Sequence, residues 1–548
     1  MVKEYFGLRG PALNYAIGII AGCDFLLFGY DQGVTGGVLT MDQFLTVFPE
    51  INPDGTDDAG LKSQRSTNQG ISVAAYNLGC FLGAVISIFV ADLLGRKRMI
   101  ILGTSVMVIG AILQASASTL PQWIVGRIIT GLGNGGNTST VPTWQSETSR
   151  SHKRGKLVMI EGALITGGIT LSYWIDLGFS FAPGSVAWRF PLAFQIAFCL
   201  FILSMVWNLP ESPRWLILKK REDEARQVLA ALADANVNDK FIQDEFLEIK
   251  ETVEEMQKGK FSDLFTNTRD REFHRTLLAY VNQVFQQISG INLITYYAAV
   301  IYKRLGLSGF LSLLLAALNG TEYFIASWPA VYLVERVGRR KLMLFGAVGQ
   351  AASMAALAGA ASLTEGDDPP KAASIAVIAL LFVFNTFFAV GWLGMTWLYP
   401  AEIVPLKIRA PANALSTSAN WIFNFLVVMI TPVAFDSIGY QTYIVFAVIN
   451  AFIVPVTYFF YPETAYRSLE EMDAIFHKAK GLRGYFTVVQ IARDEPRRYG
   501  KNGEVLIAYD ETEEHKAHMH GDPQLQHAEQ QGIDSKDGSA GAGAARVA

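Results

Sequence analysis

Two aspartates and one arginine stand inside stretches that are otherwise apolar. Asp24 and Asp31 fall in the run of apolar and small residues from Tyr15 to Leu39, and Arg127 falls in a later apolar run. A charge there costs about 2.5 to 3.5 kcal/mol to insert into a membrane, so it usually faces a cavity or a partner. Burial favours the neutral carboxyl group and a neighbouring guanidinium favours the charged one, so relative motion of Asp31 and Arg127 would load and release a proton. The alternative is a permanent ion pair that only joins two helices.

The elements that must position these charges are membrane spans. The chain has 548 residues, of which 51% are hydrophobic, 12% aromatic and 17% charged, which is too apolar for an ordinary soluble enzyme. A helix needs about 20 apolar residues to cross the hydrocarbon core. The sequence predicts twelve such windows, centred near Phe25, Cys80, Val108, Ile129, Ile169, Ala197, Ala299, Tyr323, Ala351, Phe384, Val428 and Ile449.

The windows divide the chain into two halves. Between the sixth and seventh lies a charge-rich stretch with helical apolar spacing, for example REDEARQVLAALADA. This predicts a six-helix half at 1–209, a helical cytosolic insert at 210–272 and a second six-helix half at 273–461. After Pro462 the chain turns polar and ends in small residues that cannot bury a core, so 462–548 is predicted to be a cytosolic, largely disordered tail. The predicted fold class is an all-α membrane protein with twelve transmembrane helices.

Orientation follows from the cations. Short connections with GRKR (95–98), SRSHKRGK (149–156) and ERVGRRK (335–341) alternate with connections that are neutral or acidic. Because basic loops remain on the cytosolic side, these loops are predicted to face the cytosol, and with an even number of spans both termini do too.

The two halves repeat a set of charged residues in the same order. DLLGRKR (92–98) matches ERVGRRK (335–341), a glutamate with an arginine seven residues later recurs, and PESPR (210–214) matches PETAYR (462–467). Parallel repeats are typical of transporters with a substrate path between two halves. The repeated charges predict a cytosolic gate, the alternative being that they only anchor loops at the headgroup level. The residues are Asp92, Arg96, Glu147, Arg154, Glu211, Arg214, Glu335, Arg339, Glu402, Arg409 and Glu463.

These motifs together resemble those of the sugar porter family of the major facilitator superfamily, in its fungal branch, over roughly residues 10 to 480. Further motifs of the resemblance are GYDQGVTGG (29–37), GRIITGLGNG (126–135), QQISGIN (286–292) and NWIFNF (420–425). In proton-coupled members the aspartate of GYD and the arginine of the fourth span carry the coupling, so the resemblance assigns that role to Asp31 and Arg127. It also implies the major facilitator fold.

The resemblance implies a sugar site as well. It assigns sugar hydroxyls to amides and the apolar face of the sugar to indoles, with two tyrosines as an extracellular gate. Amides suit hydroxyls because they both donate and accept hydrogen bonds. On a straight helix Gln286 and Gln287 would diverge by about 100°, so a helix break near Gly290 is expected to bring them together. The residues implied are Gln286, Gln287, Asn292, Asn424, Trp397 and Trp421 for the sugar, and Tyr296 and Tyr297 for the gate.

Departures from the family pattern leave the substrate open. Gly162, beside Glu161, stands where many hexose carriers have a glutamine, and Tyr323, beside Glu322, stands where an asparagine is usual. We expect a plasma-membrane transporter of a hexose or pentose, coupled to protons and working by alternating access. The alternatives are a passive sugar uniporter, a polyol symporter and a sugar sensor that does not transport. Asp24 receives no role.

Several other classes of function are excluded. Gly131, Gly133 and Gly136 match a dinucleotide-binding pattern but lie within an apolar helix instead of after a strand, so no cofactor is expected. The three cysteines fall in apolar runs, none of the seven histidines lies in a predicted span, and no metal site or enzymatic nucleophile is expected. A net charge of -4 without a basic face argues against nucleic acid. The expected partners are a small sugar, protons and lipid, and nothing in the sequence identifies a protein partner.

Overall fold

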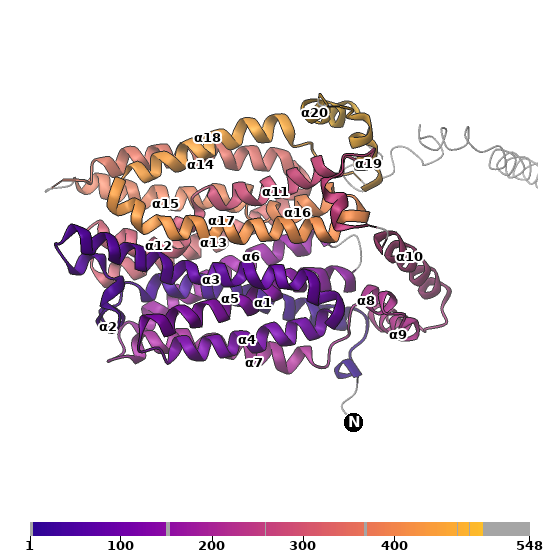
Figure 1. The fold of residues 1–548 in the computed structure, drawn as a ribbon, viewed down its shortest axis with the longest axis horizontal. Helices are drawn as coiled ribbons and strands as arrows, with labels where there is room; N and C mark the ends of the chain where they lie inside the picture. Colours follow the sequence, from indigo (N-terminus) through magenta and orange to yellow (C-terminus); the bar gives the residue numbers. More distant parts are fainter. Residues whose placement is uncertain are drawn as a thin grey trace, which may run out of the picture.

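The computed structural model describes residues 4–149, 154–257, 259–366, 370–467, 469–481 and 483–496, and every regular element in these ranges is helical. Long helices run side by side along one direction, with short helices at the two ends of the bundle (Figure 1). The N-terminal half consists of α1 (Gly10–Val38), α3 (Ala59–Leu94), α4 (Arg96–Ala115), α5 (Leu120–Thr148), α6 (Arg154–Phe179) and α7 (Val186–Val206).

The C-terminal half has the same plan, with two of its spans interrupted. It consists of α11 (Glu272–Ile288), α12 (Ile291–Arg304), α13 (Gly309–Val337), α14 (Arg339–Ser362), α15 (Lys371–Gly391), α16 (Met395–Ile403), η6 (Leu406–Ile408), α17 (Arg409–Ile438) and α18 (Gln441–Phe460). Side chains cap the starts of several long helices: Asp58 accepts from the Leu61 N–H at 2.7 Å at α3, and Ser308 accepts from the Leu311 N–H at 3.2 Å at α13.

The remaining helices lie at the ends of the bundle. The end that carries α2 (Asp42–Val47), η2 (Pro49–Ile51) and η3 (Pro53–Gly55) is called the α2 end, and the opposite end the insert end (Figure 1). The insert end carries η1 (Glu4–Gly7), α8 (Pro213–Leu218), α9 (Glu222–Ala233), α10 (Lys240–Gln257), η5 (Phe261–Phe265), α19 (Leu469–Lys478) and α20 (Gly484–Asp494).

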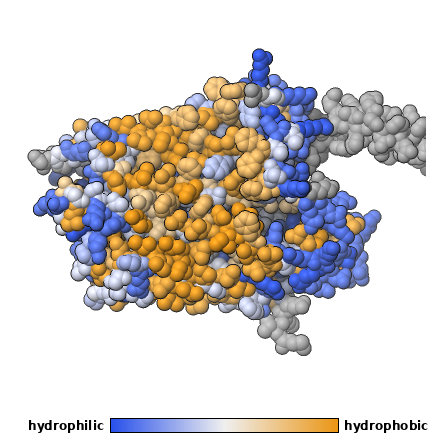
Figure 2. Space-filling model, in the orientation of Figure 1, coloured by the Kyte–Doolittle hydropathy of each residue, from blue (hydrophilic) through white to orange (hydrophobic). Residues whose placement is uncertain are grey.

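The surface of the bundle is that of a membrane protein. A broad apolar belt separates two polar ends (Figure 2), and it includes large side chains with high exposure such as Phe89 at 71% and Phe452 at 62%. Among the described residues, eleven stretches are long and apolar enough to cross a membrane. The one predicted span that is not among these eleven is the fourth in chain order, which corresponds to α5. This helix packs between α3 and α4 and is more polar because it buries Arg127, Asn134 and Asn137. Its polar residues therefore serve the interior of the bundle.

The most extensive packing between the halves is that of α3 on α17 and of α6 on α13, and α1 also packs on α12. The first pair is close enough to require a glycine, because a Cβ atom on Gly70 would lie 2.4 Å from the Met429 carbonyl oxygen. Towards the α2 end the Tyr173 hydroxyl donates to the Thr295 carbonyl at 2.9 Å, and the Ser66 hydroxyl donates to the Asp436 carboxylate. In this structure the halves are thus sealed together towards the α2 end.

At the insert end the connection between the halves is anchored on both. The Asn14 side chain of α1 donates to the Leu232 carbonyl of α9 at 3.0 Å, and Lys407 of η6 pairs with Asp263 of η5 at 3.1 Å. Backbone N–H donation from Lys260 and the Lys407 ammonium hold the pKa of the Asp263 carboxyl below its usual range.

The predicted disordered tail needs a correction for its first part. Helices α19 and α20 pack on the C-terminal half, where Arg275 of α11 pairs with Asp473 of α19 and Arg271 donates to the Gly481 carbonyl at 2.9 Å. The amphipathic spacing of the two helices supplies an apolar face that the bundle buries. Residues 497–548 of the predicted tail lie outside the described residues.

Candidate functional site

A buried ion pair lies in the N-terminal half. Arg127 of α5 donates to Asp31 of α1 at 3.1 Å, and both side chains are fully buried. Arg127 also donates to the Val73 carbonyl of α3 at 3.3 Å, and its guanidinium lies 4.7 Å from the centre of the Tyr76 ring. The second carboxylate oxygen of Asp31 and the Nε of Arg127 have no hydrogen-bond partner within the described ranges. The pair predicted from the sequence exists, and its hydrogen bonding within the described residues is incomplete.

Asp24 lies seven residues earlier on α1 and also faces α5. Its carboxylate accepts from the Asn137 amide at 2.8 Å, and the same amide donates to Thr104 of α4 at 2.9 Å. Glu161 of α6 is also buried, with 4% of its surface exposed. Sequence reasoning missed the partner Asn137, although its type in an apolar helix is a signal for a polar contact.

Three of the four predicted amides form one network around a helix break. Helix α11 ends at Ile288 and α12 begins at Ile291, with Gly290 at a φ of +104°, which confirms the expected interruption. The Asn292 amide donates to Gln287 Oε1 at 2.6 Å, and the Gln287 amide donates to Gln286 Oε1 at 3.0 Å. Asn420 of α17 donates to the same Gln286 oxygen at 2.9 Å. Asn420 was not predicted as a site residue.

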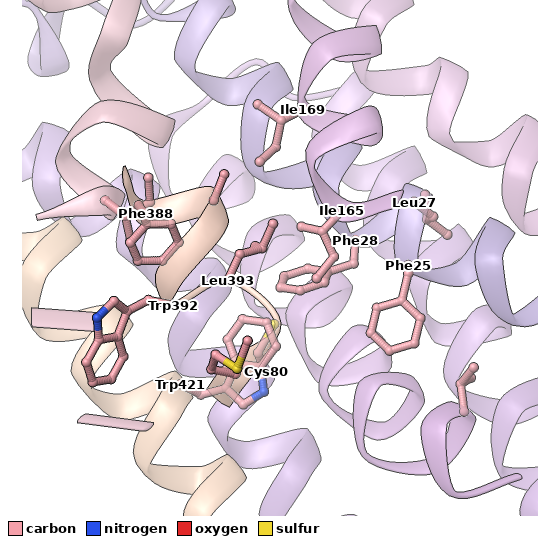
Figure 3. Close-up of a cluster of buried hydrophobic side chains, with 14 of the residues drawn as sticks. Phe25, Leu27, Phe28, Cys80, Ile165, Ile169, Phe388, Trp392, Leu393 and Trp421 are labelled. Carbon is pink, nitrogen blue, oxygen red and sulfur yellow. The ribbon is translucent and has the colours of Figure 1, made fainter. Parts of the chain in front are cut away.

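The aromatic residues around this network come from both halves. Trp421 of α17 is fully buried, with its ring centre 5.2 Å from that of Phe28 of α1 and 6.3 Å from that of Tyr76 of α3. Figure 3 shows Trp421, Phe28 and Leu393 gathered at this meeting of the halves. Trp397 of α16 is only half-buried, and no ring contact places it beside Trp421 in the part of the chain described.

Asn424 lies one turn after Trp421 on α17. Its side chain is 1% exposed, and its amide oxygen has no hydrogen-bond partner among the described residues. An unpaired buried amide oxygen costs stability unless a ligand or water satisfies it, so the Asn424 oxygen is free to accept from either.

The two predicted gate tyrosines are both buried but make different contacts. The Tyr296 hydroxyl donates to Asn77 of α3 at 3.0 Å and so links the halves, whereas the Tyr297 hydroxyl donates to the Val428 carbonyl of the same half at 2.9 Å. Tyr296 is therefore the one of the two whose hydroxyl bond must break if α12 moves away from α3.

The repeated charges of the N-terminal half form a network at the insert end. Arg96 pairs with Asp92 at 2.7 Å and with Glu147 at 3.1 Å. Glu211 accepts from the backbone N–H groups of Arg96 at 3.0 Å and Lys97 at 3.2 Å at the start of α4, although burial still raises the pKa of its carboxyl. A carboxylate at this helix N-terminus also complements the helix dipole.

The C-terminal half builds the same network from the second set. Arg339 pairs with Glu335 at 3.0 Å and with Glu402 at 2.7 Å. Glu463 accepts from the backbone N–H groups of Arg339 at 2.8 Å and Arg340 at 3.2 Å. The sequence repeat is thus matched by a repeat in geometry.

Three of the predicted gate residues are not part of the ion pairs described for the two networks. Each network brings its predicted charges together within one half, and neither joins the two halves in this structure. Arg409 donates to the Val404 carbonyl at 3.1 Å, Arg214 is half-buried, and the side chain of Arg154 lies outside what the structure describes. The role of these networks as a gate remains a prediction.

We expect Arg339→Lys to weaken the C-terminal network, because an ammonium cannot reproduce the planar fork that contacts Glu335 and Glu402 together. The expected result is a fall of several degrees in the melting temperature of the purified protein and about tenfold slower uptake. Arg336→Lys is the matched control, since Arg336 lies over the Tyr332 ring outside the network. Equal behaviour of the two variants would show that the network does not brace the helix ends.

Two repeated six-helix halves with buried polar side chains where they meet are typical of membrane transporters of the major facilitator superfamily. Residues 17–476 match the family model described as "Sugar (and other) transporter". The chain belongs to this sugar porter family.

Relatives agree with this assignment. The chain is 41% identical over 483 residues to the sugar transporter STL1 of Saccharomyces cerevisiae, covering 87% of this chain and 83% of that protein. It is 31% identical to a high-affinity glucose transporter of Kluyveromyces lactis, covering 88% and 89%. Among solved structures, the proton:xylose symporter XylE bound to 6-bromo-6-deoxy-D-glucose has the same fold, with a TM-score of 0.71, 24% identity and coverage of 84% and 98%.

Proposed function

We propose that this protein carries a monosaccharide, a hexose or a pentose, across the plasma membrane together with a proton by alternating access. The observation that carries the proposal is the position of Tyr76. Its ring contacts the Arg127 guanidinium at 4.7 Å on one side and the Trp421 ring at 6.3 Å on the other. A substrate that moves Trp421 therefore acts, through one side chain, on the ion pair of Asp31.

The amide network supplies the substrate site in this proposal. Gln286, Gln287, Asn292 and Asn424 offer donors and acceptors that match sugar hydroxyls, and Trp421 offers a ring for the apolar face of the sugar. The names of two similar proteins, a glucose transporter and a proton:xylose symporter, support a sugar and a proton. We assign the insert end to the cytosol, which places both ends of the chain there.

Uptake measurements separate this proposal from its alternatives. Labelled glucose, xylose, arabinose and glycerol are offered to a transporter-deficient host that expresses the full chain, with external pH recorded. The expected result is uptake of a hexose or pentose with alkalinisation of the medium. Sugar uptake without alkalinisation would indicate a passive uniporter, preferential glycerol uptake a polyol symporter, and no uptake at normal surface expression a sensor.

We expect Gly162→Gln combined with Tyr323→Asn to shift selectivity about three- to tenfold towards hexoses. A Cβ atom on Gly162 would meet Leu393 at 3.6 Å, an ordinary contact, so the longer side chain has a way into the region between the halves. Tyr323 is 4% exposed and packs against Phe388. The measurement is the ratio of glucose to xylose uptake, and an unchanged ratio would show that these positions do not face the sugar.

A further inference from the structure

A cavity of about 500 Å³ lies at the insert end of the N-terminal half. Its walls are the start of α4, the chain after α7, and helices α8 and α9 of the insert, which lie together at that corner in Figure 1. The amide network, Asp31 and Arg127 are not among its lining residues. The cavity therefore belongs to a separate place from the proposed sugar path.

Unpaired positive charge lines this cavity. Lys97 and Arg98 of α4 line it and form no ion pair among the described residues, whereas Arg221 is paired with Glu224. The other carboxylate in the lining, Glu211, is occupied by the backbone N–H groups of Arg96 and Lys97. The charge of Glu211 still acts on Lys97, so Arg98 is the cation of this lining that has no carboxylate beside it among the described residues.

The cavity lies where the apolar belt meets the polar insert end of the bundle (Figure 2). Two of its lining residues, Ile101 of α4 and Trp207 after α7, belong to membrane-spanning stretches or their ends, and Trp207 is 66% exposed. Figure 2 shows the apolar belt giving way to the polar insert at this end of the molecule. A tryptophan at such a boundary is typical of a membrane interface, so one wall is apolar and the other cationic.

At the equivalent corner of the C-terminal half, groups of the protein itself contact the counterpart of Lys97. Arg340, the counterpart of Lys97 in the repeat, donates to the Tyr458 carbonyl at 2.7 Å and lies over the Tyr458 ring at 4.9 Å. Helix α20 covers the end of α18 there, with the Phe486 and Phe460 rings 5.0 Å apart. In the C-terminal half, Arg340 and the end of α18 are thus contacted by the protein's own polar and aromatic groups. The corresponding corner of the N-terminal half contains the cavity.

We propose that this cavity binds the phosphate-bearing headgroup of an anionic membrane lipid. Lys97 and Arg98 would contact the phosphate, and the acyl chains would lie along Ile101 and Trp207. Juxtamembrane lysines and arginines attract anionic lipids in this way. A free phosphate compound shares the headgroup chemistry but would not use the apolar wall, so the two sources are separable.

The test uses the delipidated full-length protein in detergent and titrates dioctanoyl phosphatidylserine, followed by native mass spectrometry. We expect saturable binding that is about 30-fold weaker in Lys97→Gln/Arg98→Gln and about fivefold weaker in Arg98→Gln alone. Lys219→Gln/Lys240→Gln removes the same charge from exposed insert positions outside the cavity, and we expect it to bind as the wild type does. Dioctanoyl phosphatidylcholine should bind less tightly.

Three results would overturn the proposal. The first is equal phosphatidylserine binding by the wild type and both cavity variants. The second is displacement of phosphatidylserine by inorganic phosphate at a similar concentration, which would identify a free phosphate as the ligand. The third is no saturable binding by the wild type. If the double variant does not fold, as judged by gel filtration and melting temperature, Arg98→Gln decides the question because Arg98 is exposed.

Discussion

Asp31→Asn is expected to abolish accumulation of sugar against its gradient while exchange down a gradient continues. Asparagine keeps the size of aspartate and an oxygen that can accept from Arg127, which lies 3.1 Å away, but it cannot bind and release a proton at neutral pH. The accumulation ratio should therefore fall to about 1, and sugar-induced alkalinisation should disappear. Both are measured in cells, with counterflow as the assay for exchange.

The alternative of a permanent structural ion pair predicts a different outcome. Removing one partner would leave the fully buried Arg127 charge without compensation and would harm folding and surface expression. Asp24→Asn is the matched control on the same helix, because Asp24 contacts the Asn137 amide instead of an arginine. If Asp31→Asn still concentrates sugar and takes up protons, the symport mechanism is wrong, and either uniport or coupling through Asp24 replaces it.

Gln287→Ala and Asn424→Ala are each expected to reduce the initial rate of sugar uptake at least about tenfold. Gln287 joins Gln286 to Asn292, with contacts of 3.0 and 2.6 Å, and its loss would leave a sugar hydroxyl without a partner. The Asn292 amide would keep only its longer hydrogen bond, to the Gln287 carbonyl at 3.2 Å. An unsatisfied buried polar group costs about 1 to 3 kcal/mol, which corresponds to the expected loss. Rates are normalised to the amount of protein at the surface.

A buried amide outside the network provides the control. Asn385 of α15 donates to Asn319 of α13 at 2.8 Å and touches none of the four predicted sugar amides through a hydrogen bond in the described ranges. Asn385→Ala should therefore affect stability more than uptake. Normal uptake by Gln287→Ala, Asn292→Ala and Asn424→Ala together would move the substrate site elsewhere.

The structure could be predicted from the sequence at positions where the type of the residue leaves few possible arrangements. A carboxylate in an apolar span requires a partner, which is why Asp31 and Arg127 could be paired in advance. The position of Gly290 within a polar helical stretch predicted a break in that helix. The structure explains the break, because Gly290 adopts a left-handed backbone conformation. The charged repeat likewise predicted two similar networks. The same charged residues recur at the same spacing in both halves, so corresponding helices place them at corresponding positions.

The remaining contacts depend on which faces of distant helices meet. Tyr76 between Arg127 and Trp421, and Asn137 beside Asp24, join helices that are far apart in the sequence, so local spacing cannot reveal them. For a similar reason, the sequence analysis did not predict that α19 and α20 form packed helices. Their composition is polar overall, and only docking against the bundle supplies an apolar partner.

The insert, finally, links the two halves at its end of the bundle and would resist their separation there. It is fixed to α1 through Asn14 and to η6 through the Asp263–Lys407 pair. A carboxyl group with a lowered pKa stays ionised, and keeps its ion pair, at every pH above the usual pKa range of carboxyl groups. It loses the pair only as the pH falls through the lowered pKa. The restraint from the Asp263 carboxylate therefore operates unchanged across neutral pH and is released only under strong acidification.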